Sequence, residues 1–189
     1  MISENEALQL IKNGSKYNHA IMVSQIMEEI AHMLGENAEE WKIVGLLHDL
    51  DHDETRDAPH QHGIVASEKL KGKLPERCIH AIRAHDNRTG LKAESKLDKA
   101  LIASDSLANL IEKTDKTANE LNVTTLHAEL KNVSLRKTWF KNNIWQCEEF
   151  GVRLDDFLRL GLNSMKEKRA QKKSLTCMVC IPFPGAPLQ

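Results

Sequence analysis

Apolar residues recur at helical spacing along almost the whole chain, and this periodicity limits what the sequence can fold into. In the segment 17–34, for example, Ile26, Ile30 and Met33 lie on one stripe, and Gly35 stands where a helix would end. Alternating runs of β-branched residues bounded by hairpin turns, which are typical of strands, are absent from the sequence. The sequence therefore predicts an all-α fold.

The ends of the predicted helices follow from residues that favour helix starts and stops. Asn37 is a favourable N-cap with Glu40 three residues later, and Pro59 and Pro75 stand at positions where helices commonly begin. We expect helices at residues 4–12, 17–34, 37–48 and 96–113, one that begins at Pro59 and carries His62, one that begins at Pro75 and carries His85, and three more near 118–131, 134–149 and 154–171.

The length of 189 residues predicts one domain with a helical extension. We expect an N-terminal helix in residues 1–14, a helical core in 15–113, a C-terminal helical extension in 114–172 and a flexible tail in 173–189. In the tail, Cys177 and Cys180 form a lone CxxC motif with no second pair nearby to complete a zinc site. Three prolines in the last nine residues favour an extended end.

The charge balance excludes a strong general attraction to polyanions. The formal net charge is -1, so neither a nucleic-acid partner nor an acidic membrane surface is expected. No apolar stretch approaches the roughly 18 residues that span a bilayer, and the beginning MISENEALQL lacks the basic segment of a signal peptide. The four cysteines have no framework spacing. We expect a cytoplasmic protein with free thiols.

Histidines and aspartates occupy core-facing positions on several of the predicted helices. Imidazole and carboxylate together form the ligand set of a divalent first-row metal ion. His48 and Asp49, which are adjacent, serve one ion only where the helix ends, and the acidic stretch DLDHDETRD predicts such an end. A buried, unpaired Asp105 would cost several kcal/mol, and a cation is one reason for its presence. The candidate ligands are His19, His48, Asp49, His62, His85 and Asp105.

Each of these residues has a simpler explanation when it is taken alone. His19 could be a hydrogen-bonded core histidine, Asp49 a cap at a helix end, and Asp105 the partner of a lysine or arginine. His62 could be a polar residue in the first turn of its helix. We expect His52, His60 and His80 to be solvated or packing residues. Because all the candidates occur together, in this order along the chain, we favour a metal site over these separate explanations.

The order His19, His48-Asp49, Asp105 resembles the HD superfamily of metal-dependent phosphohydrolases, over residues 15–113. The segment HDLDHDETRDAPHQHG is similar to the insert of a subset of these proteins, in which a further histidine stands at the place of His85. The resemblance implies an HD-domain-like helical bundle that binds one or two divalent metal ions (Mn, Fe, Co, Ni, Zn or Mg).

The same resemblance implies how the ligands divide. One ion would be held by His19, His48, Asp49 and Asp105, and a second by His62, His85 and a bridging Asp49. Many dinuclear members have two consecutive histidines where this chain has His85-Asp86. The second ion is therefore short of one imidazole unless His80 or Asp86 replaces it.

The resemblance implies hydrolysis of a phosphate monoester or diester, with a nucleotide or another small phosphorylated molecule as substrate. Asp49 would lie closest to the metal and the attacking water, and Asp51 would act as a general acid or base, or orient an imidazole. Arg88, in the polar loop HDNRTG, is a candidate for binding the phosphate. An HD-fold di-iron oxygenase and a non-catalytic metal or nucleotide sensor remain open. The aromatic-rich segment 138–162 is expected to cap the core or to contact a second subunit in a homodimer.

Overall fold

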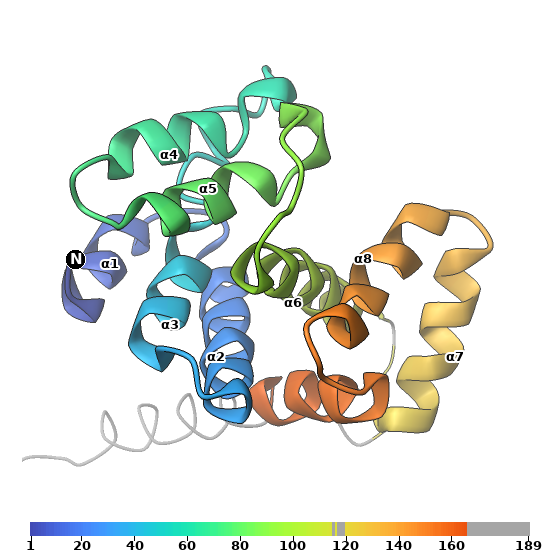
Figure 1. Ribbon diagram of the computed structural model, residues 1–189. Helices are drawn as coiled ribbons and strands as arrows, with labels where there is room; N and C mark the ends of the chain where they lie inside the picture. The colour runs from blue at the N-terminus through green and yellow to red at the C-terminus, as the bar shows by residue number, and fades with distance from the viewer. Residues whose placement is uncertain (115, 117–119, 166–189) are drawn as a thin grey trace, which may run out of the picture.

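The computed structural model describes residues 1–114, 116 and 120–165, and every regular element in these ranges is helical (Figure 1). The all-α prediction is therefore confirmed. The elements are α1 (Glu4–Ile11), α2 (Tyr17–Leu34), α3 (Ala38–Leu47), the 3₁₀ turn η1 (Pro59–Gln61), α4 (Ile64–Leu70), α5 (Glu76–Ala84), the 3₁₀ turn η2 (Asn87–Thr89), α6 (Lys96–Lys113), α7 (Val123–Ser134), α8 (Thr138–Glu149) and a helix over residues 154–165.

Helices α2 and α3 form an antiparallel pair joined by a tight turn. Gly35 ends α2 in the left-handed conformation, with φ of 68°, and the side chain of Asn37 accepts a hydrogen bond from the backbone N–H of Glu40. Gly45 of α3 packs directly on the α2 backbone, since a Cβ at Gly45 would lie 2.6 Å from the Cα of Ser24. This close approach brings the start of α2 next to the end of α3.

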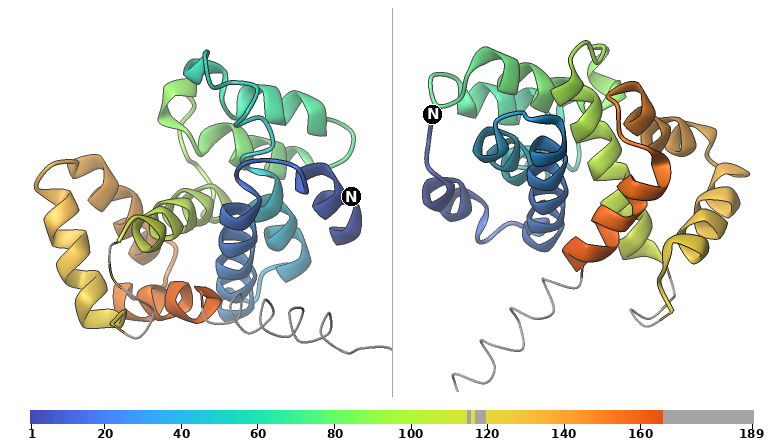
Figure 2. Two further views of the ribbon diagram at one scale, coloured as in Figure 1. Left: turned by 180° about the vertical axis from the view of Figure 1, so that it is seen from behind. Right: turned by 60° about the horizontal axis from the view of Figure 1, so that its bottom comes forward.

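Helix α6 lies in the middle of the molecule, between two groups of helices (Figures 1 and 2). Helices α1 to α5 lie on one side of it, and α7, α8 and the helix over 154–165 lie on the other. One continuous core joins both groups, because Leu107 of α6, Ile144 of α8 and Phe157 of the last helix are all fully buried members of it. The helices described after α6 thus pack on the same core as those before it.

The helix predicted to begin at Pro59 and carry His62 is interrupted. Pro59 opens only the 3₁₀ turn, His62 is extended with ψ of 135°, and α4 begins at Ile64. Between them, Gly63 has φ of 78°, a conformation that favours glycine. Because the buried carboxylate of Asp51 accepts hydrogen bonds from the N–H groups of Gly63 and Ala66, the chain turns here instead of continuing as one helix.

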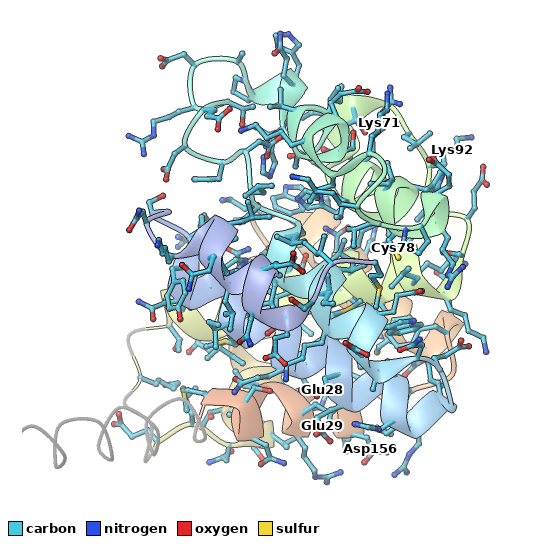
Figure 3. All side chains as sticks on the ribbon, turned by 90° about the vertical axis from the view of Figure 1, so that its left-hand side faces the viewer. Glu28, Glu29, Lys71, Cys78, Lys92 and Asp156 are labelled. Carbon is cyan, nitrogen blue, oxygen red and sulfur yellow. The ribbon has the colours of Figure 1, made fainter. Side chains whose placement is uncertain are left out.

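The helix predicted near 118–131 begins later, because Asn122 caps α7 through the backbone N–H of Thr125. The predicted tail, its CxxC motif and the end of the last predicted helix lie outside the described residues. Within the described ranges, no helix is both long and apolar enough to cross a membrane. Cys78, labelled in Figure 3, and Cys147 are buried free thiols, as expected for these two cysteines.

Candidate metal centre

Six residues from five separate segments converge at the centre of the molecule. They are His19 in the first turn of α2, His48 and Asp49 directly after α3, His62 between η1 and α4, His85 directly after α5, and Asp105 in the middle of α6. All six are the predicted metal ligands, and the structure brings all of them together. Helix α3 ends at Leu47, directly before His48, where the acidic stretch predicted an end.

Asp49 lies at the centre of this cluster, with its side chain 7% exposed. Its Oδ2 is 3.5 Å from Nε2 of His48 and 3.9 Å from Nε2 of His19. Its Oδ1 is 3.0 Å from Nε2 of His62 and 3.8 Å from Nε2 of His85. The two oxygens of one carboxylate therefore face two different pairs of imidazoles.

Asp105 completes the half of the cluster that contains His19 and His48. Its Oδ1 is 2.8 Å from Nε2 of His19 and 3.8 Å from Nε2 of His48. Asn109, one turn further along α6, donates a hydrogen bond of 2.8 Å to the same oxygen. The carboxylate is thus held in place from its own helix.

The four clustered imidazoles are each anchored through Nδ1, so that Nε2 is directed into the cluster. The anchors are the carboxylate of Glu112 for His19 (3.0 Å), the carbonyl of Gly45 for His48 (2.7 Å), the carboxylate of Asp51 for His62 (2.8 Å) and the carbonyl of Ile82 for His85 (2.5 Å). A carbonyl oxygen only accepts hydrogen bonds, so Nδ1 of His48 and of His85 carries a proton and donates, which leaves Nε2 of each ring facing the cluster. Metal-binding histidines in proteins are typically oriented in this way.

The donor set fits a divalent metal ion. Nε2 of His48 is buried and makes no hydrogen bond, although an unsatisfied buried polar atom is costly. Three groups of potential ligand atoms, each within 4.8 Å of one another, occur in the described residues: His19, His48 and Asp105; His48, Asp49 and His85; and Asp49, His52 and His62. Imidazole with carboxylate suits Mn, Fe, Co, Ni or Zn.

The electrostatics of the cluster favour protonated histidines, and a bound cation would displace these protons. Burial alone would lower the pKa of His19, but hydrogen bonds to Asp105 and Glu112 outweigh it and raise the pKa to about 9. Burial likewise opposes protonation of His62, but hydrogen bonds to Asp49 and Asp51 raise its pKa to about 10. Without metal, protons on these imidazoles compensate the clustered carboxylates.

Asp51 is fully buried, and its carboxylate is occupied by three hydrogen bonds. Oδ1 bonds Nδ1 of His62, and Oδ2 accepts from the backbone N–H groups of Gly63 and Ala66. Burial raises the pKa of Asp51, but the bonds from His62 and Ala66 outweigh it and the pKa is lowered. This arrangement suits the orientation of an imidazole, the second of the two roles predicted for Asp51.

A polar cavity of about 790 Å³ opens from the cluster. Asp49, His62, His85 and Asp105 line it, together with Lys16, whose Nζ is 3.8 Å from Oδ2 of Asp49. Arg88 also lines the cavity, half-exposed, with its guanidinium paired to Asp86. The predicted phosphate-binding arginine therefore borders the same space as the predicted ligands.

The sequence left open whether His80 or Asp86 replaces the missing imidazole. His80 lies 3.0 Å from the buried Asp98, outside the cluster, as expected for a packing residue, and the carboxylate of Asp86 is paired with Arg88. His52, expected to be solvated or packing, instead has its ring 5.7 Å from that of His62 and belongs to one of the three ligand groups. The bend of the chain after α3 turns it back toward Asp49.

Sequence reasoning also missed three residues around the cluster, although a signal for each was present. Asn109 and Glu112 lie four and seven residues after Asp105, on the same face of α6. Lys16 lies three residues before His19. Helical spacing from a proposed ligand would have identified all three.

The comparisons with known proteins agree with this geometry. The family model of the HD domain matches residues 17–119, which is more than half of the chain and includes all six clustered residues. No match was found among curated proteins or among solved structures. The convergence of His19, His48-Asp49 and Asp105 and the extent of the match show that the chain belongs to the HD-domain family.

Proposed function

We propose that this protein is a metal-dependent phosphohydrolase that cleaves a phosphate monoester or diester of a small molecule. The observation that carries the proposal is the set of four imidazole Nε2 atoms that surround Asp49 at the base of an open polar cavity. Membership of the HD-domain family supports it, since these domains are commonly metal-dependent phosphohydrolases.

The two oxygens of Asp49 support a site with two ions. His19, His48, Asp105 and Oδ2 of Asp49 would hold the first, and His62, His85, His52 and Oδ1 of Asp49 the second. When bound, divalent ions supply Lewis acidity, which activates water as a nucleophile near neutral pH and offsets charge on a phosphoryl group.

The protein's own side chains would bind and orient the phosphate. Lys16 places a positive charge beside Asp49, at the edge of the cluster that faces the cavity. A cation there attracts a phosphate and stabilises the charge of its oxygens during hydrolysis. Asp51 would keep the imidazole of His62 in position during the reaction, and Glu112 would do the same for His19.

The test is phosphate release and metal content measured on the same samples. We expect the full chain, purified without chelators and loaded with Mn²⁺, Co²⁺ or Zn²⁺, to release phosphate from some members of a panel of monoesters and diesters. Asp49→Ala should lose metal and activity together, because both halves of the cluster share this carboxylate. Asp57→Ala is the matched control, since Asp57 is an exposed aspartate on the same loop.

Full activity and normal metal content in Asp49→Ala would refute the proposal. Oxygen consumption with a phosphate-free substrate, and no phosphate release, would instead assign an oxygenase to the same ligand set. Tight metal binding without turnover of any kind would assign a sensor.

A further inference from the structure

Helix α8 supplies one wall of the cavity, although it lies outside the residues matched by the family model. Its contribution consists of Trp139, Asn143 and Gln146, which line the cavity together with Asn109 of α6. Spacings of four and three residues place these side chains on one face of α8. The helix packs against α6, so this wall is held firmly next to the cluster.

The two amides on this wall have hydrogen-bonding capacity left for a ligand. Asn143 is half-buried and donates 3.1 Å to the hydroxyl of Ser106, which fixes the side chain with its amide carbonyl unused by that bond. Gln146 is also half-buried, and within the described residues its side chain makes no hydrogen bond. A glutamine amide offers both donors and an acceptor.

Trp139 adds a flat apolar surface next to these amides. The residue is 51% exposed and borders the cavity, and its ring packs edge-to-face on Phe140 with 5.4 Å between ring centroids. Phe140 is buried, so the indole lies at the edge of the core. An exposed indole beside amides that have unused donors and acceptors suits a planar ring that carries hydrogen-bonding groups. The indole stacks on the face of such a ring, and the amides bond its edge.

We propose that the face of α8 formed by Trp139, Asn143 and Gln146 determines specificity, and that it binds a nitrogen-containing aromatic ring such as a nucleobase. That the phosphate of such a ligand lies at the metal cluster rests on the proposed function. That the face of α8 binds the ring does not rest on it. The cavity of about 790 Å³ accommodates a small ligand of this kind, within the range of roughly 300–1,000 Å³ usual for small-molecule sites.

The test separates ring binding from hydrolysis. Adenosine, guanosine, cytidine and uridine carry no phosphate, so their binding to the metal-loaded full chain is measured by calorimetry without turnover. Hydrolysis of the four nucleoside 5′-monophosphates is measured in parallel with that of ribose 5-phosphate, which lacks the ring.

We expect at least one nucleoside to bind, and Trp139→Ala and Gln146→Leu each to weaken its binding about tenfold. The same variants should raise KM for the corresponding monophosphate and leave hydrolysis of ribose 5-phosphate unchanged. Trp145→Ala and Asn142→Leu are the matched controls, because both residues are exposed on α8 and neither lines the cavity. Both controls should bind like the wild type.

If no nucleoside binds, or if the wall variants bind like the controls, the inference is wrong. Absence of phosphate release from every ester would overturn the proposed function, but the nucleoside titrations would still decide the role of α8. Circular dichroism spectra identical to the wild type would show that the variants fold.

Discussion

Replacement of Gly45 by alanine tests how closely the fold and the metal centre depend on each other. A Cβ at this position would lie 2.6 Å from Cα of Ser24, 2.9 Å from its N and 3.1 Å from the carbonyl carbon of Val23. All three atoms belong to the α2 backbone, so no side-chain rotation relieves the overlap. The two helices must separate by almost 1 Å, roughly the difference from ordinary van der Waals contact.

Two opposing effects set the magnitude of this change. Overpacking of a core costs about 1–3 kcal/mol, and a backbone-to-backbone clash belongs at the upper end of this range. Alanine is better than glycine inside a helix by about 1 kcal/mol. We therefore expect Gly45→Ala to lower the free energy of unfolding by about 2 kcal/mol, which corresponds to a fall in Tm of about 4–8 °C.

The same displacement should reach the metal centre. The rings of His19 on α2 and His48 after α3 are 5.5 Å apart, and Nδ1 of His48 donates to the carbonyl of Gly45 itself. A loss of about 10–100-fold in metal affinity is usual when the support of a ligand is disturbed, and we expect a loss of this size.

The assay is urea denaturation of the chelator-treated protein, followed by metal titration of the folded variant. Gly161→Ala is the control, because Gly161 is also helical but the three atoms nearest to its added methyl group would be side-chain atoms of Leu107 and Ile111, which shift more easily than backbone atoms. It should be destabilised less and keep its metal affinity. If Gly45→Ala is as stable as the wild type, or loses stability but binds metal normally, the reasoning is refuted.

Three further predictions follow from the buried polar groups. Asp51→Asn should weaken metal binding about 10–100-fold in a metal titration, because His62 loses the carboxylate that orients it; unchanged affinity would contradict this role. Burial raises the pKa of both Cys78 and Cys147 to about 12, so neither thiol should be alkylated in the native protein at pH 8, as peptide mapping would show. Metal binding at pH 8 should release protons, because neighbouring carboxylates overcome burial and raise the pKa of His19 to about 9 and of His62 to about 10. Affinity should therefore rise with pH up to that range, and binding heats that are equal in buffers of different ionisation enthalpy would contradict proton release.

The parts of the structure predicted well are those that depend on local sequence. The bounds of α2 and α6 agree with the helical periodicity, since Gly35 ends α2 and Ser95 caps α6 through neighbouring backbone groups. The end of α3 at the His48-Asp49 dipeptide was likewise predictable from the acidic stretch after it.

Features that depend on long-range contacts were not predicted. The break at His62 requires Asp51, which is eleven residues away, to accept hydrogen bonds from the start of α4. The position of His52 next to His62 depends on how the chain bends after α3. Helix α8 reaches the cavity only because it packs on α6, and no spacing in the sequence links Gln146 to Asp105.

The His48-Asp49 dipeptide explains how one segment serves both halves of the centre. Successive residues inside an α-helix point about 100° apart, so adjacent side chains in an unbroken helix would not share one ion. Here the regular helix ends at Leu47, and the carbonyl of Gly45 holds His48 inward. Asp49 lies in the turn that follows, and its two oxygens face His19 and His48 on one side and His62 and His85 on the other. Because α3 ends here, one short segment supplies an imidazole to one half of the cluster and a carboxylate that both halves share.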